Sequence, residues 1–213
     1  MVCKNRSLEF ALWHRLYDGK SFRDLAWKPA RASRRLDDCR TEHTLTYADH
    51  KTGLQVRCVA VEYLDFPTVE WTVYFKNAGA SRTPILENIQ GLDVTFEREN
   101  AGEFVLHGVR GDTCAAESFR PYAIVLGPGA LKRCSPPVAG DKVSGKSSDG
   151  PDGWPYWNLQ RPGGGIILAV GWPGQWEATF ARERLDGARE LILQIDGAGD
   201  GISCDQADCA DAK

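Results

Sequence analysis

Apolar and polar residues alternate with a period of two through the first half of the chain. Residues 44–47 lead into a polar turn at 49–53, and the alternation resumes at 54–58. After a turn marked by Pro67, a third run holds four apolar side chains at alternate positions: Val69, Trp71, Val73 and Phe75. Because successive strand side chains point to opposite faces, this pattern predicts three meandering strands, with these four side chains on one face.

Shorter β-like runs continue toward the end of the chain, separated by Gly, Pro, Asp and Asn breakers. They cover residues 92–97, 103–107, 122–126, 166–171, 177–180 and 191–195. Helical periodicity is nearly absent, and the only short helix candidates are residues 21–25 and 115–119. We therefore predict an all-β fold, a two-sheet antiparallel β-sandwich with few or no helices.

Residues 132–165 break this rhythm. The stretch 132–153 is rich in Ser, Pro, Gly, Asp and Lys and holds no apolar run, and the pattern predicts that a loop with aromatic residues follows it at once. A connection of this length is long for a compact domain, so we expect a loop that is either flexible or functional.

Length and composition indicate a single packed domain. The chain has 213 residues, of which 42% are hydrophobic and 26% charged, which is ordinary for a globular protein. Residues 196–213 differ, with five Asp against one Lys. We predict one sandwich domain over residues 1–195 and an acidic, flexible tail over 196–213.

The charge balance and hydropathy exclude two classes of partner. Lys+Arg 26 against Asp+Glu 29 gives 26 − 29 = −3, too balanced for a surface that tracks nucleic acid. No apolar run approaches the roughly 20 residues of a membrane helix, and the first residues show no signal-peptide pattern. We expect a soluble chain that binds neither nucleic acid nor membrane, and its cellular location stays open.

The sequence offers no anchor for a metal, a cofactor or a catalytic nucleophile. Its seven cysteines form no C-x-x-C pair, and no histidine stands at metal-ligand spacing. Neither a G-x-S-x-G turn nor a phosphate-binding loop is present. We expect no metal, no cofactor and no catalytic residue, and we interpret most of the cysteines as small buried apolar groups.

Aromatic residues gather between positions 154 and 176, where five of them include four of the seven Trp. Flat rings with polar neighbours suit sugars, because a pyranose presents C–H groups on one face and hydroxyls at its edge. The predicted carbohydrate-binding residues are Asp149, Trp154, Tyr156, Trp157, Asn158, Trp172, Gln175 and Trp176. Core packing is the alternative, favoured for Trp172 and Trp176 and evenly weighted for Trp154 and Trp157.

Several segments resemble the N-terminal β-sandwich of α-galactosidase-like glycoside hydrolases, family 36 and its relatives. The likeness lies in residues 66–79, 83–93, 144–148, 155–159 and 163–176, and its most specific element is Gly-Trp-Pro-Gly-Gln-Trp at 171–176. The resemblance implies a supersandwich of the galactose-mutarotase-like type, which precedes a (β/α)₈ barrel that carries two catalytic Asp residues. No barrel lies within these residues, so we expect this chain not to be an enzyme by itself.

Three functions follow from these observations. The first is a non-catalytic domain that binds a galactoside-type carbohydrate or frames the active site of a glycosidase barrel. The second is a scaffold whose aromatic residues pack on a barrel or on a second copy in a homo-oligomer, since large aromatics are enriched at interfaces. The third is a stand-alone sugar-active enzyme, which would need His107 to meet Glu87 or Asp93 in one cleft.

Overall fold

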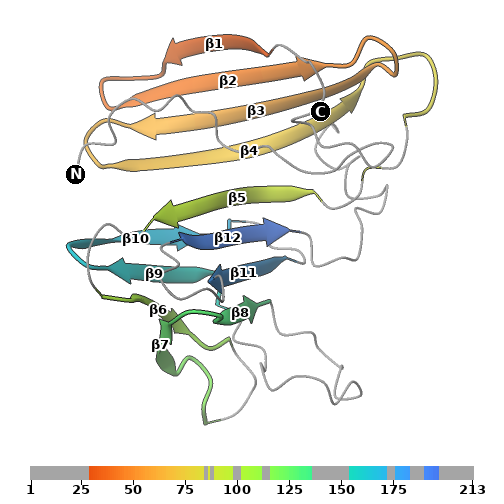
Figure 1. The fold of residues 1–213 in the computed structure, drawn as a ribbon. Helices are drawn as coiled ribbons and strands as arrows, with labels where there is room; N and C mark the ends of the chain where they lie inside the picture. Colours follow the sequence, from red (N-terminus) through yellow and green to blue (C-terminus); the bar gives the residue numbers. More distant parts are fainter. Residues whose placement is uncertain are drawn as a thin grey trace. The chain divides into compact units, whose positions relative to one another are not determined.

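The computed structural model describes residues 29–83, 86, 89–97, 102–111, 116–135, 154–171, 176–182 and 190–196. This part of the chain forms β-strands and turns and no helix (Figure 1). No helix long and apolar enough to cross a membrane is found within it. The described residues fall into two compact units, residues 29–91 and residues 92–196.

The first unit is a four-stranded meander in the order β1-β2-β3-β4 (Figure 1). Its strands are β1 (Ala30–Arg35), β2 (Arg40–Ala48), β3 (Leu54–Tyr63) and β4 (Thr68–Asn77), all paired antiparallel. The turn between β2 and β3 closes through a bond from the Gly53 amide to the Asp49 carbonyl oxygen, 2.8 Å. Gly53 has a φ of +77°, which favours glycine over residues that carry a Cβ.

The period-two pattern is confirmed in this sheet. On β3, Leu54, Val56, Cys58 and Ala60 are buried at every second position. On β4, the side chains of Val69, Trp71, Val73 and Phe75 are half-buried, whereas those of Thr68, Glu70 and Thr72 are exposed. One face of the sheet therefore carries the apolar side chains. The indole Nε1 of Trp71 donates a hydrogen bond to the Gly91 carbonyl oxygen, 2.9 Å.

The second unit contains two four-stranded sheets. One has the order β10-β9-β6-β7 and the other β5-β12-β11-β8. The strands are β5 (Gln90–Glu97), whose first two residues belong to the first unit, β6 (Phe104–Val109), β7 (Pro121–Leu126), β8 (Leu131–Cys134), β9 (Tyr156–Arg161), β10 (Gly164–Ala169), β11 (Glu177–Arg182) and β12 (Glu190–Asp196). The neighbouring pairs β10–β9, β9–β6, β6–β7, β12–β11 and β11–β8 are antiparallel.

Aromatic contacts join the two sheets of this unit face to face. Trp157 of β9 has no exposed surface, and its ring lies edge-on to Phe180 of β11 at 5.7 Å and to Trp176 at 5.5 Å between centroids. Phe104, Leu106, Leu159, Leu191 and Leu193 are also buried. The all-β, antiparallel sandwich class is thus confirmed. The expectation of a single domain over residues 1–195 stays a prediction, and the tail after residue 196 lies outside the described residues.

Two local predictions were wrong. The pattern predicts loops over residues 132–165, yet this segment contributes most of β8, all of β9 and the start of β10. Only residues 136–153 of it lie outside the described part of the chain. The short helix candidate at 115–119 is also absent, because residues 116–119 form turns; the candidate at 21–25 lies outside the described residues.

The structure predicts unequal reactivity for three cysteines. Cys39 is exposed, while Cys58 and Cys134 are buried, and burial raises the pKa of the Cys58 thiol to about 11. Because the thiolate is the nucleophile, iodoacetamide at pH 8 should modify Cys39 in the native chain and spare the other two. Peptide mapping by mass spectrometry, before and after denaturation, checks this. Rapid native modification of Cys58 would show that the apolar face of the meander is open to solvent.

Candidate functional site

Three exposed aromatic rings lie near one end of the sheet β10-β9-β6-β7. Phe119 is 51% exposed, Trp154 46% and Tyr156 44%. We call these three residues the aromatic surface. Trp157, next in the chain, is fully buried, so the exposure is specific to these positions and is not a general property of the aromatic-rich segment.

The strand register explains why residues 119 and 154 meet. β7 and β9 both pair antiparallel with β6, so they run in the same direction and begin at the same end of the sheet. Phe119 comes two residues before β7, and Trp154 comes two residues before β9. Their rings contact edge to face, with centroids 5.5 Å apart and planes at 82°, a favourable arrangement for an aromatic pair.

The backbone holds these rings in place. The Tyr156 amide donates to the Trp154 carbonyl oxygen at 2.8 Å, and the Val170 amide donates to the Pro155 carbonyl oxygen at 2.9 Å. Phe119 has a φ of +59°, a left-handed conformation that is costly for a bulky aromatic residue and that recurs at binding sites. The arrangement presents apolar ring faces to solvent on a fixed backbone.

The structure divides the predicted carbohydrate-binding residues into three groups. Trp154, Tyr156 and Asn158 are exposed, and Tyr156 and Asn158 occupy alternate positions on β9 and share a face. Trp157 and Trp176 are in the sandwich core, so in this structure their rings pack against protein. Asp149, Trp172 and Gln175 lie outside the described residues. The sequence pattern does not predict Phe119, because its contact with Trp154 depends on β7 and β9 both pairing with β6.

The pairing that a stand-alone sugar-active enzyme requires is not seen. The His107 Nε2–H donates to Gln160 Oε1 at 2.8 Å, so this histidine bonds an amide and not a carboxylate. Asp93 belongs to β5, in the other sheet of the sandwich, and Glu87 lies outside the described residues. Among the described residues, no group of three or more His, Cys, Asp or Glu side chains is arranged to hold a metal ion.

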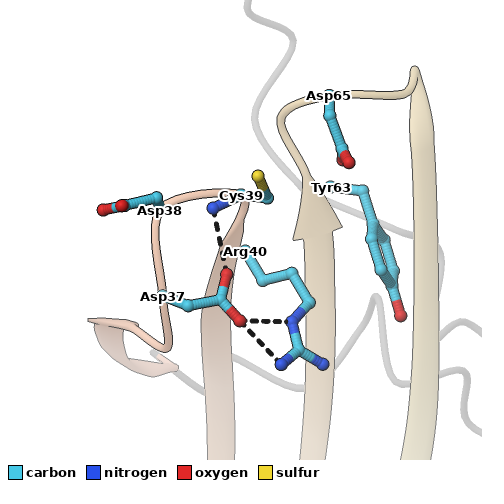
Figure 2. A pocket seen from close by; sticks show the side chains of 6 residues that line it. All are labelled: Asp37, Asp38, Cys39, Arg40, Tyr63 and Asp65. Carbon is cyan, nitrogen blue, oxygen red and sulfur yellow. Dashed lines mark hydrogen bonds and ion pairs between the residues drawn. The ribbon is translucent and has the colours of Figure 1, made fainter.

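A second cluster lies at one end of the first unit, in a shallow surface pocket of about 500 Å³. Figure 2 shows its lining residues, Asp37, Asp38, Cys39, Arg40, Tyr63 and Asp65. Asp37 Oδ2 accepts a hydrogen bond from Arg40 Nε at 2.8 Å, and Oδ1 accepts one from the Cys39 amide at 2.9 Å. The bond from Arg40 is the main reason that the pKa of Asp37 is lowered. This carboxylate stabilises the β1–β2 turn and is already bonded.

A line of hydrogen bonds crosses three strands of the same unit. Ser33 Oγ lies 2.9 Å from His43 Nδ1, and His43 Nε2 lies 3.2 Å from Glu62 Oε2. These are the residue types of a nucleophilic triad, but Ser33 lies within the extended strand β1 and not on an exposed sharp turn. We interpret the line as cross-strand pairing that fastens β1 to β2 and β3.

The fold is similar to part of a known glycosidase. The crystal structure of an α-galactosidase from Lactobacillus brevis matches with a TM-score of 0.50 and 13% sequence identity, over 82% of this chain and 27% of that chain. The chain thus spans about a quarter of the length of that protein. No protein-family profile and no curated protein matches the sequence. At this identity the likeness shows the fold alone, and it supports the resemblance noted from the sequence.

Proposed function

We propose that the second unit, which we call the sandwich unit, is a non-catalytic carbohydrate-binding domain. In this proposal the aromatic surface stacks on a sugar ring. The observation that carries this proposal is the exposure of three aromatic rings at one end of a sheet whose next aromatic, Trp157, is completely buried. Burial is the usual state of such side chains. Clustered exposed rings are typical of a surface that binds a ligand.

The neighbouring side chains support a sugar as the ligand. Asn158 and Gln160 are exposed on the same face of β9 as Tyr156, and an amide can both donate to and accept from a hydroxyl. Ring faces for the C–H side of a pyranose and amides for its edge are thus adjacent. A galactoside is the sugar class to test first, because the similar structure is that of an α-galactosidase.

The fold likeness favours a second candidate function. The matching part makes up only 27% of the α-galactosidase chain, which is the relation expected of a domain that accompanies a catalytic domain. In that case the aromatic surface would pack on a barrel and frame its active site. Binding to sugar by this chain alone distinguishes the first candidate from this one and from self-association into a homo-oligomer.

Replacing Trp154 with Ala is the direct test. We expect isothermal titration with galactose, raffinose and galactomannan to give saturable heat for the unchanged chain, and a loss of at least tenfold in affinity for Trp154→Ala. The melting temperature should stay nearly the same, because an exposed side chain contributes little to stability.

The matched control is Leu131→Ala, which removes an exposed apolar side chain, 56% accessible, from β8 in the opposite sheet. It should leave sugar affinity unchanged. Absence of heat with every sugar, together with a concentration-dependent increase in mass, would replace the carbohydrate-binding function by the scaffold function.

A further inference from the structure

Polar side chains continue the aromatic surface along β9. Tyr156, Asn158 and Gln160 stand at alternate positions, and all three are exposed. Alternate residues of a strand lie about 7 Å apart on one face, so these three side chains extend over about 14 Å. We call these three residues the β9 strip.

The β10 side of the β9 strip is bordered by two small residues and by the exposed side chain of Ile167. The register places Ala169 beside Tyr156 and Gly165 beside Gln160, with Ile167 between them beside Asn158. A Cβ atom at Gly165 would lie 3.0 Å from Asn158 Oδ1. Glycine at this position therefore leaves room for the amide of Asn158, while Ile167 adds an apolar side chain beside the middle of the strip.

The other side of the strip fixes one of its amides. His107 of β6 pairs with Asn158 in the register, and its Nε2–H donates to Gln160 Oε1 at 2.8 Å. Since the carbonyl oxygen of Gln160 is held in this way, its amide N–H groups are directed away from His107. The strip thus presents a fixed donor about 14 Å from Tyr156.

We infer that the ligand is an extended, neutral oligosaccharide that runs along β9; this inference rests on the proposed carbohydrate-binding function. One sugar ring stacks on the aromatic surface, and the following rings lie over Asn158 and Gln160. A single sugar held at Trp154 does not reach Gln160, so a monosaccharide site would leave the far amide unused. The strip and its partners on β10 carry no carboxylate, ammonium or guanidinium group, and its partners on β6 are Val105 and His107, whose imidazole bonds Gln160. This lining favours a neutral ligand over an acidic one.

Titrations of the full chain with galactose, the trisaccharide raffinose and the tetrasaccharide stachyose test this inference. Affinity should increase with the number of sugar units. Gln160→Ala should weaken stachyose binding about tenfold, which corresponds to one lost hydrogen bond with its desolvation cost, and leave galactose binding unchanged. Asn158→Ala is the second variant, since it does not disturb the bond to His107. Gln194→Ala, on β12 of the opposite sheet, is the matched control and should bind like the unchanged chain.

The outcomes separate this inference from the function on which it rests. Equal affinities for galactose and stachyose, insensitive to both Gln160→Ala and Asn158→Ala, would overturn the extended site and leave a single-sugar site in place. Heat with none of the three sugars would overturn both proposals.

Discussion

Trp157→Ala is expected to destabilise the sandwich unit by about 3–5 kcal/mol, the range for emptying a buried aromatic position. The side chain has no exposed surface and contacts both Trp176 and Phe180 across the two sheets. Its indole Nε1 also donates a hydrogen bond to Tyr122 Oη at 3.2 Å. The substitution removes these ring contacts and leaves a cavity that the surrounding strands can fill only in part.

Urea unfolding followed by far-ultraviolet circular dichroism measures this effect without depending on tryptophan fluorescence. Trp154→Ala is the matched control, because it removes the same ring from an exposed position three residues away, and it should cost less than about 1 kcal/mol. Similar losses for the two variants would mean that Trp157 is not a core residue.

The strand β4 and the segment around Trp154 and Trp157 show what the sequence can and cannot predict. Alternation of Val69, Trp71, Val73 and Phe75 predicted their shared face correctly, because a sheet with one buried face forces a period of two. The segment that begins at Trp154 gave no such pattern, since Gly, Pro and polar residues precede it and aromatics stand next to one another. The pattern therefore predicts a loop in this segment, whereas the structure has the strand β9.

Once β9 is recognised, part of the site follows from the sequence. Tyr156 and Trp157 are neighbours in a strand, so their side chains must point to opposite faces, and Trp157 faces the core. Tyr156, Asn158 and Gln160 then share the exposed face. Phe119 could not be found this way, because its contact with Trp154 depends on two strand starts that come together only when β7 and β9 both pair with β6.

The same strand therefore connects stability and proposed function. Trp157 fixes β9 against the other sheet, and this contact sets the direction of the side chains on either side of it. The sugar-binding proposal then implies that core substitutions on β9 weaken binding through loss of structure, whereas Trp154→Ala weakens it with the structure intact. Comparing affinity with melting temperature across these variants separates the two causes.

Glu103→Ala is expected to destabilise the sandwich by about 3 kcal/mol, because it removes a carboxylate that bonds a buried guanidinium. The side chain of Arg182 has 0% exposed surface, and its Nη1 donates to Glu103 Oε2 at 2.7 Å and to the Leu126 carbonyl oxygen at 3.2 Å. The guanidinium also lies over the Phe104 ring at 5.4 Å. Glu103 is 32% exposed, so water compensates part of the loss and the lower end of the range for buried pairs applies.

A double-mutant cycle with Arg182→Met tests whether the lost bond to the buried guanidinium is the cause. If it is, Glu103→Ala in the Arg182→Met background should cost much less than in the unchanged chain, because no buried cation then remains to be compensated. Methionine retains most of the apolar packing of the arginine stem against Phe104. Equal costs of Glu103→Ala in both backgrounds, measured by urea unfolding, would show that the pair is not coupled and that Glu103 stabilises the sandwich in another way.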